Sequence, residues 1–427
     1  MRAGRLAIAV CFLIYDLYGE TPDEWSSRAE NAIRSGNSNA ALEALQKAGA
    51  LPGQTAATQD RIGFLYAVLG KNAEAVSCFE KALASSGDYA PAHFHLGVAL
   101  WLRNQYDRAL PELERAAKLS PKTFDYRYRL GSAYLQTENY QAATDELKTA
   151  TSLNGTVADA WNQLGRALQK QRDLAAAVQA YAKAVALDPK SVNYRNDYGY
   201  MLIETRQADK AIEIFGQILS ESPRNANVRV NLGYAYLKKG EFESAAKAFR
   251  AAIETDPKSP AAHYDLGIAL KMQDQIEPAQ KEFREAIRLD PSLPEAHYTL
   301  GITNWQLGDF PGTVEQMRAA LAVRPDYAEA HYMLGIALKQ SGDLDGAVPE
   351  LKEAIRLDPS TPGPYNTLGQ ILRIKGDKQG SEDAFATGAR LKREKESQLA
   401  NTLDQGMRGG VMPQPMAAPQ ADSSKGR

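Results

Sequence analysis

Small and apolar residues recur along the chain with a period of 34 positions. Glycine occupies ten positions with this spacing and without insertion or deletion: Gly63, Gly97, Gly131, Gly165, Gly199, Gly233, Gly267, Gly301, Gly335 and Gly369. Alanine follows twelve positions later in eight units, as at Ala279 and Ala347, while Thr313 and Ser381 take this place in the other two. Proline closes many units, as at Pro291. A fixed period of this length predicts an array of similar structural units.

The pattern within one unit predicts two helices. Residues 331–338 place His, Leu, Gly and Leu at i, i+3, i+4 and i+7, which is one face of a helix. Residues 347–355 place Ala, Leu, Ala and Ile at i, i+4, i+7 and i+8, which is one face of a second helix. Gly342 and Asp343 between them favour a turn. Pro359 ends the second helix because it lacks a backbone donor and restrains the residue before it. Each unit is therefore predicted to be a helical hairpin, without strands.

The recurring glycine lies within the predicted first helix. Glycine in a helix costs about 1 kcal/mol relative to alanine, so its repeated presence requires a compensating gain. We expect that gain to be close packing, with the alanine of the second helix touching the backbone of the first. The packing role is assigned to Gly267, Gly301, Gly335, Ala279 and Ala347. The substitution Gly335→Leu should then destabilise the protein more than the same change at Gly346, which is expected to be exposed.

This combination of positions resembles the tetratricopeptide repeat, or TPR. The unit from Ala328 to Thr361 matches the pattern of an aromatic residue, Leu-Gly, Ala and Pro over 34 residues closely. In the same phase, eleven repeats extend over residues 22–395. The resemblance implies an all-α fold, a right-handed superhelical solenoid of hairpins. It also implies that the first helix of each hairpin lines a concave groove for segments of partner proteins, and that neighbouring repeats bury each other's faces.

At equivalent positions of successive first helices, the chain carries aromatic and aliphatic residues. In the family, these positions line the concave groove. The candidate binding residues are Tyr264, Ile268, Tyr298, Ile302, Trp305, Tyr332 and Ile336. An apolar groove of this kind would suit a helix or an extended segment of a partner. Alternatively, these residues match the family consensus and pack against neighbouring repeats. The asparagine that begins the family's clamp for terminal carboxylates is missing at its phase, so that clamp is not expected.

Histidine is the residue type that most invites a chemical hypothesis. His93, His263, His297 and His331 share one phase. They could form a metal site or a proton relay, or they could replace the family's tryptophan as flat rings packed between helices. The sequence shows no carboxylate recurring beside them, so we expect packing and no metal. Phosphate-binding loops, HExxH and GxSxG motifs are absent from the sequence, so neither an enzyme nor a cofactor is expected.

Composition narrows the classes of partner. Hydrophobic residues make up 44% and charged residues 24% of the 427 residues, which is ordinary for a folded protein. The formal charge of −2 provides no basic field for nucleic acid, so proteins or peptides are the expected partners. Two cysteines exclude a disulfide framework.

The two ends of the chain differ from the repeats. Arg2 and Arg5 precede an apolar run over residues 6–15, which fits the core of a signal peptide and is too short to span a bilayer. Residues 1–21 are therefore predicted to be a signal peptide or an N-terminal anchor, with membrane contact only through this segment if it is not cleaved. Residues 396–404 are predicted to extend and cap the last helix, and residues 405–427 to form a disordered tail.

These observations lead to two functional hypotheses. The first is a non-enzymatic scaffold for protein–protein interaction, exported to the periplasm or medium, or anchored at its N-terminus, with the cytoplasm as the alternative location. The second is an accessory or regulatory subunit of a cell-envelope enzyme or of a secretion or assembly complex.

Overall fold

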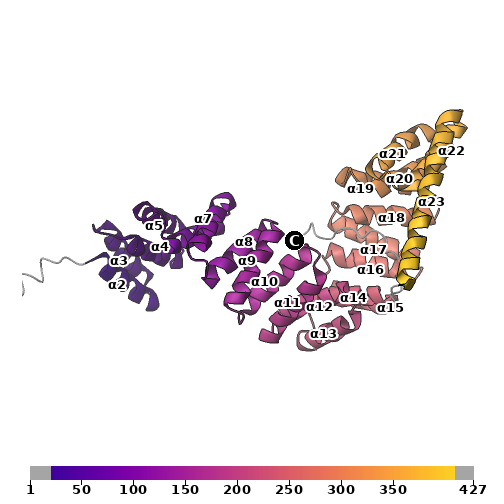
Figure 1. Ribbon diagram of the computed structural model, residues 1–427. Coiled ribbons are helices and arrows are strands. Elements are labelled where there is room, and N and C mark those ends of the chain that lie inside the picture. Colours follow the sequence, from indigo (N-terminus) through magenta and orange to yellow (C-terminus); the bar gives the residue numbers. More distant parts are fainter. Residues whose placement is uncertain (1–20, 409–427) are drawn as a thin grey trace, which may run out of the picture. The chain divides into compact units, whose positions relative to one another are not determined.

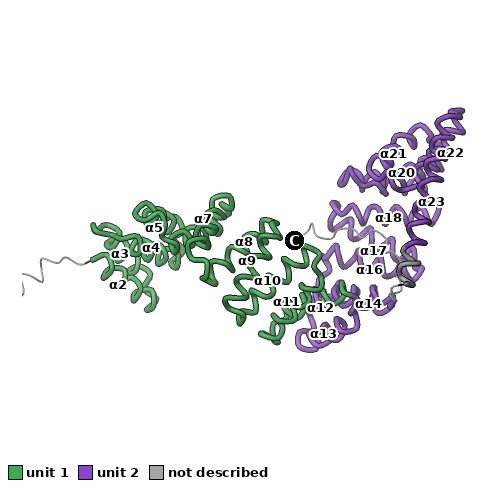
Figure 2. The backbone as a smooth tube through the Cα atoms, viewed as in Figure 1, with its two compact units in different colours: residues 1–205 green, residues 206–427 purple. Residues whose placement is uncertain are grey.

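The computed structural model describes residues 21–408, with side chains as far as residue 401. Over this range the chain forms 22 helices and no strand, so the predicted all-α fold is confirmed. The chain divides into two compact units, residues 1–205 and 206–427 (Figure 2). The predicted signal or anchor segment and most of the predicted tail lie outside the described residues.

Unit 1 is a series of helices of similar length (Figure 1). These are α2 (Pro22–Arg34), α3 (Ser38–Ala50), α4 (Ala56–Val68), α5 (Asn72–Ser85), α6 (Ala90–Leu102), α7 (Tyr106–Leu119), α8 (Phe124–Gln136), α9 (Tyr140–Leu153), α10 (Ala158–Lys170), α11 (Leu174–Leu187) and α12 (Val192–Glu204). Up to α11 they pair as hairpins, and each second helix also packs against the first helix of the next hairpin. Unit 1 is thus a helical solenoid.

Unit 2 repeats this arrangement. It contains α13 (Ala208–Glu221), α14 (Ala226–Lys239), α15 (Phe242–Thr255), α16 (Pro260–Lys271), α17 (Ile276–Leu289), α18 (Pro294–Gln306), α19 (Phe310–Val323), α20 (Ala328–Gln340), α21 (Leu344–Leu357), α22 (Pro362–Ile374) and α23 (Lys378–Arg408). Helix α23 continues to Arg408, four residues past the boundary drawn from sequence at 404. Its exposed surface carries an i,i+4 ion pair between Arg390 and Glu394 at 2.7 Å.

Every hairpin turn contains one residue with left-handed backbone. These residues are again 34 apart: Gly36, Gly70, Asn104, Glu138, Arg172, Arg206, Gly240, Asp274, Gly308, Gly342 and Gly376. Only six of the eleven are glycine, although glycine adopts this conformation most readily. The turn is therefore imposed by the hairpin, and the turn signal at Gly342 marks a conformation that other residue types also adopt.

The recurring glycines are buried where the two helices of a hairpin meet. A Cβ added at Gly267 would lie 2.5 Å from Phe283 Cε1, and one at Gly335 would lie 2.7 Å from Leu351 Cγ. The closest group is thus a large side chain sixteen positions after the glycine. The expected alanine contact is secondary, because the same Cβ at Gly335 would be 3.4 Å from the carbonyl oxygen of Ala347. The two helices do approach closely, but the missing side chain mainly makes room for a large residue of the second helix.

The alanine positions are fully buried beside these glycines. Ala279 and Ala347 are 0% exposed. Where threonine replaces alanine, the Thr313 hydroxyl donates a hydrogen bond to the carbonyl of Gly301 at 3.2 Å. This bond shows that the alanine position faces the glycine backbone across the hairpin, so a small side chain is required there.

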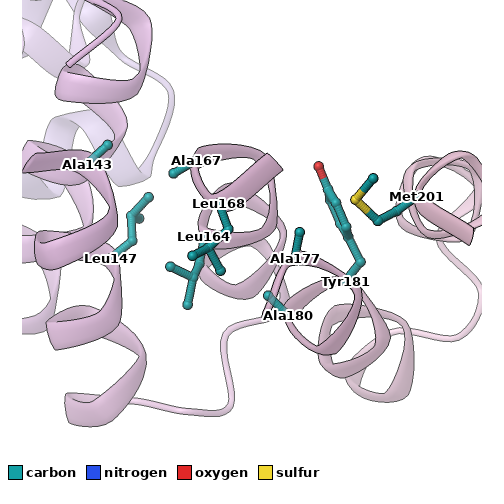
Figure 3. Packing of buried hydrophobic residues seen from close by; sticks show 9 residues of the cluster. All are labelled: Ala143, Leu147, Leu164, Ala167, Leu168, Ala177, Ala180, Tyr181 and Met201. Atoms are coloured by element: carbon teal, nitrogen blue, oxygen red, sulfur yellow. The ribbon is translucent and has the colours of Figure 1, made fainter. Parts of the chain in front are cut away.

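Larger side chains from successive helices fill the rest of the core (Figure 3). In one cluster of unit 1, Leu147 of α9 packs with Leu164 of α10, and Tyr181 of α11 with Met201 of α12. Each helix therefore contributes to the clusters on both of its sides, which is the packing expected of a repeat array.

Candidate protein-binding face

The seven candidate residues lie on three successive first helices of unit 2, α16, α18 and α20 (Figure 1). We call the surface formed by Tyr264, Ile268, Tyr298, Ile302, Trp305, Tyr332 and Ile336 the aromatic face. They occupy positions i, i+4 and i+7 of their helices, which share one side of a helix. All seven are half-buried, so each combines a packed part with a part open to solvent.

The packed part of each tyrosine contacts the next hairpin. The Tyr264 hydroxyl lies 3.4 Å from Oγ1 of Thr299 on α18. The Tyr298 ring centroid is 5.0 Å from that of Tyr327, just before α20. Tyr332 packs so closely on Gly363 of α22 that a Cβ there would lie 2.5 Å from the Tyr332 hydroxyl. These contacts hold the rings in fixed orientations, which favours a preformed surface.

Burial changes the ionisation of polar groups on this face. It raises the pKa of Tyr264 and of Tyr298, which keeps both phenols neutral. Burial also raises the pKa of Asp265 to about 7. Lys271 at the end of α16 has a lowered pKa for the same reason. The face is therefore apolar with isolated charged groups that are poorly solvated.

A second apolar surface occurs in unit 1 and was not singled out from the sequence. Phe64 and Val68 on α4 are 47% and 54% exposed, and Leu102 on α6 is 69% exposed. The sequence indicates this surface only through Leu102, which is apolar, whereas equivalent positions of other repeats carry polar residues such as Gln306 and Gln340.

The shared phase of four histidines has a structural cause that the sequence analysis missed. In His263, Nδ1 lies 2.7 Å from the Glu282 carboxylate of α17, and Nε2 lies 3.4 Å from the carbonyl of Pro257 before α16. The same pair of contacts joins His331 to Glu350 at 2.6 Å and to the Pro325 carbonyl at 3.0 Å. The expectation that no carboxylate recurs beside these histidines was wrong, because it lies 19 residues further on.

Each of these side chains links the loop before the first helix of its hairpin to the second helix of the same hairpin. His93 makes this link with Glu112, and His297 makes it with the Gln316 amide. Arg127 occupies the same phase and makes it with Glu146 and the carbonyl of Pro121. Both ring nitrogens of His263 and of His331 thus contact oxygen atoms of their own hairpin or of the loop before it. Within residues 21–401 no cluster of three potential ligands is found.

A tetratricopeptide repeat family model matches residues 63–122, 103–158, 230–294 and 298–362, which together span more than half of the chain. The model of the cytochrome c-type biogenesis protein H TPR domain matches residues 146–261. No curated protein matches the chain.

Solved structures with a similar arrangement of helices include three TPR-like arrays. MamA is 23% identical and covers 39% of this chain and 97% of its own, with a TM-score of 0.38. Yeast Tom70 is 16% identical, covers 91% of this chain and 96% of its own, and has a TM-score of 0.44. Cut9 in complex with Hcn1 gives 15% identity, 88% coverage of both chains and a TM-score of 0.40. From the family-model matches and the repeated hairpins, the chain belongs to the tetratricopeptide repeat family.

Proposed function

We propose that this protein is a non-enzymatic scaffold whose aromatic face binds a helical or extended segment of a partner protein. The observation that carries this proposal is the row of half-buried tyrosine and isoleucine side chains on α16, α18 and α20. Aromatic residues that are held rigidly and partly exposed are typical anchors of protein interfaces. Repeat arrays present such rows as extended binding surfaces.

The test uses peptides selected from a random-peptide display library on the full-length protein. Their affinity is then measured for the wild type and for the double variant Tyr298→Ala, Ile302→Ala. Losing two contact residues should weaken binding by about tenfold or more, since interface anchors contribute about 1–2 kcal/mol each. The matched control is Val323→Ala, an apolar residue 41% exposed at the end of the second helix α19.

The double variant also removes packing, because Tyr298 and Ile302 adjoin the core cluster around Leu334. Circular dichroism at the temperature of the binding assay must therefore show unchanged helicity. Equal affinity of the three folded proteins for every selected peptide would refute the proposal.

A second candidate function is an accessory or regulatory subunit of a cell-envelope complex. The observation that favours it is the match of residues 146–261 to the cytochrome c-type biogenesis protein H TPR domain. Among the described helices, none has the length and apolarity needed to cross a membrane. Cell fractionation and native purification would test this function. It requires export or membrane attachment and one stoichiometric complex, and a protein recovered from the cytoplasm without such a complex would contradict it.

A further inference from the structure

We propose that Asp265 is the recognition group for a lysine or arginine side chain of the partner segment that docks on the aromatic face. This inference rests on the proposed function and adds the chemistry of the ligand. Asp265 lies on α16 directly after Tyr264 and three positions before Ile268, so it belongs to the same side of unit 2. Asp265 as a whole is half-buried, so part of the residue is open to solvent.

A regular contact between neighbouring first helices shows why this carboxylate is unusual. Residues 35 apart in the chain face each other across successive hairpins. Where the later residue of the pair lies a multiple of 34 positions from Asp265, three pairs are hydrogen-bonded: Asp60 with His95 at 2.8 Å, Asn162 with Asp197 at 3.2 Å, and Tyr264 with Thr299 at 3.4 Å. Each of these pairs gives a polar group on the inner side of its helix a partner within the chain.

The residue 35 positions before Asp265 is Val230 on α14, whose apolar side chain cannot donate a hydrogen bond. Val230 packs in the core cluster that also contains Tyr264 and Ile268. Among the described residues, no group donates a hydrogen bond to the Asp265 carboxylate, and burial is the cause that raises its pKa. Within the described residues, the burial of this carboxylate is thus not offset by a hydrogen bond or an ion pair.

The cations of α14 are engaged elsewhere. Arg229 donates to the backbone carbonyl of Ala251 and, at 2.8 Å, to the hydroxyl of Thr255. Lys238 Nζ lies 4.9 Å from the centre of the Tyr234 ring. Lys239 Nζ lies 2.7 Å from the carboxylates of Asp209 and Glu241. None of the three cations pairs with Asp265, so the protein itself leaves the site open for a charge supplied by another chain.

A basic side chain matches this site better than other ligands. An ammonium or guanidinium group supplies both opposite charge and hydrogen-bond donors, which together offset the desolvation of a carboxylate. The neighbouring Tyr264 ring is a surface on which a cation can also be attracted. An anionic or purely apolar ligand would leave the carboxylate buried and unpaired, at a cost.

The experiment continues with the peptides selected from the display library. For an enriched peptide that contains lysine, a second peptide carries norleucine in its place, which keeps the stem and removes the charge. Affinities of both are measured by fluorescence anisotropy for the wild type, for Asp265→Asn and for the control Asp274→Asn. Asp274 is exposed in the turn after α16, at φ 60°, a conformation that asparagine tolerates well.

We expect the wild type and Asp274→Asn to prefer the lysine peptide by about tenfold, as for a charge-assisted hydrogen bond. In Asp265→Asn this preference should disappear while the norleucine peptide binds as well as before. An unchanged preference in Asp265→Asn, or selected peptides that lack basic residues, would overturn the inference alone. Peptides that bind independently of Tyr298 and Ile302 would instead overturn the proposed function, and the inference with it.

Discussion

At the scale of single residues, the glycine in each first helix decides how closely two helices approach. Leu351 and Phe283 occupy space that a Cβ on Gly335 or Gly267 would enter. Sequence spacing predicted the close approach correctly. It did not identify the large side chain that packs on the glycine, because that side chain lies on another helix. Its type varies among leucine, phenylalanine, tyrosine and methionine.

A first prediction compares two helical glycines of unit 2. Gly335→Ala should destabilise the protein by about 1–3 kcal/mol because the added methyl group overpacks the core. Gly216→Ala on α13 should stabilise it by about 0.5–1 kcal/mol, since that glycine is exposed with nothing within 4 Å of an added Cβ. Urea denaturation followed by circular dichroism measures both changes, and shifts of the same sign would refute the packing account.

Gly346 is unsuitable as the control expected from sequence. It is half-buried, and its backbone N–H donates the capping hydrogen bond to Oδ1 of Asp343 at 2.8 Å. A Cβ at Gly346 would collide with that carboxylate. A helix cap depends on three-dimensional contacts of this kind, which a count of residues between glycines does not show.

A second prediction concerns the pH dependence contributed by Asp265. The pKa of this carboxyl is about 7 in the folded protein, above its ordinary value, so its folded state binds the proton more tightly. Its contribution to stability is complete below the unfolded pKa of about 4 and is lost as pH rises through 7. Asp265→Asn should therefore be more stable than the wild type at pH 8. Because Asp265 as a residue is only half-buried, we expect this advantage to be smaller at pH 5 by only about 1–2 kcal/mol.

Urea denaturation of both proteins at the two pH values measures this difference. Asp274→Asn is the control, because it removes an exposed carboxylate and should show the same pH dependence as the wild type. Parallel pH profiles of the wild type and Asp265→Asn would show that the carboxyl titrates normally in the fold.

At the scale of helices and turns, the hairpin overrides local preference. Glu138 and Arg172 are exposed residues at φ 61° and 66°, at a turn position that is glycine in six other hairpins. A turn signal in the sequence predicts only the glycine cases. The strain of about 1–2 kcal/mol for other residues is small beside the packing of two helices, so the conformation persists where the signal is absent.

A third prediction follows from these strained turns. Glu138→Gly and Arg172→Gly should each stabilise unit 1 by about 0.5–1 kcal/mol, because relief of strain exceeds the entropy cost of glycine. The reverse change, Gly70→Ala at φ 73°, meets no atom within 4 Å and should destabilise by a similar amount through strain alone. Thermal unfolding measures all three. A loss of stability in the two glycine variants would contradict this explanation.

At the scale of the whole molecule, repeat identity, helix number and hairpin pairing followed from the period of 34. The histidine links did not, because one partner is a backbone carbonyl and the other is 19 residues away, as in His331 with Pro325 and Glu350. The isolation of Asp265 also escaped prediction, since it depends on which residue lies 35 positions earlier. Periodicity specifies the framework, and contacts between repeats specify the chemistry of its surface.

A fourth prediction tests whether stability in unit 2 is transmitted only between neighbouring hairpins. Leu368 and Ile371 of α22 are buried in the same cluster as Leu334 and Leu338 of α20. A chain ending at Thr361 loses α22 and α23, so α20 and α21 should exchange their amide hydrogens faster, because apolar surface is exposed to water. The main contacts of helices α14 and α15 are with each other, α13 and α16, so both should keep their protection.

Hydrogen exchange followed by mass spectrometry reads all four helices in one experiment, with a chain ending at Arg408 as the control. A graded loss that fades from α21 towards α14 would also fit nearest-neighbour coupling of finite strength. Uniform loss of protection across unit 2 would show that its hairpins fold as one cooperative body. The aromatic face on α16, α18 and α20 would then depend on the terminal hairpin as strongly as on its own neighbours.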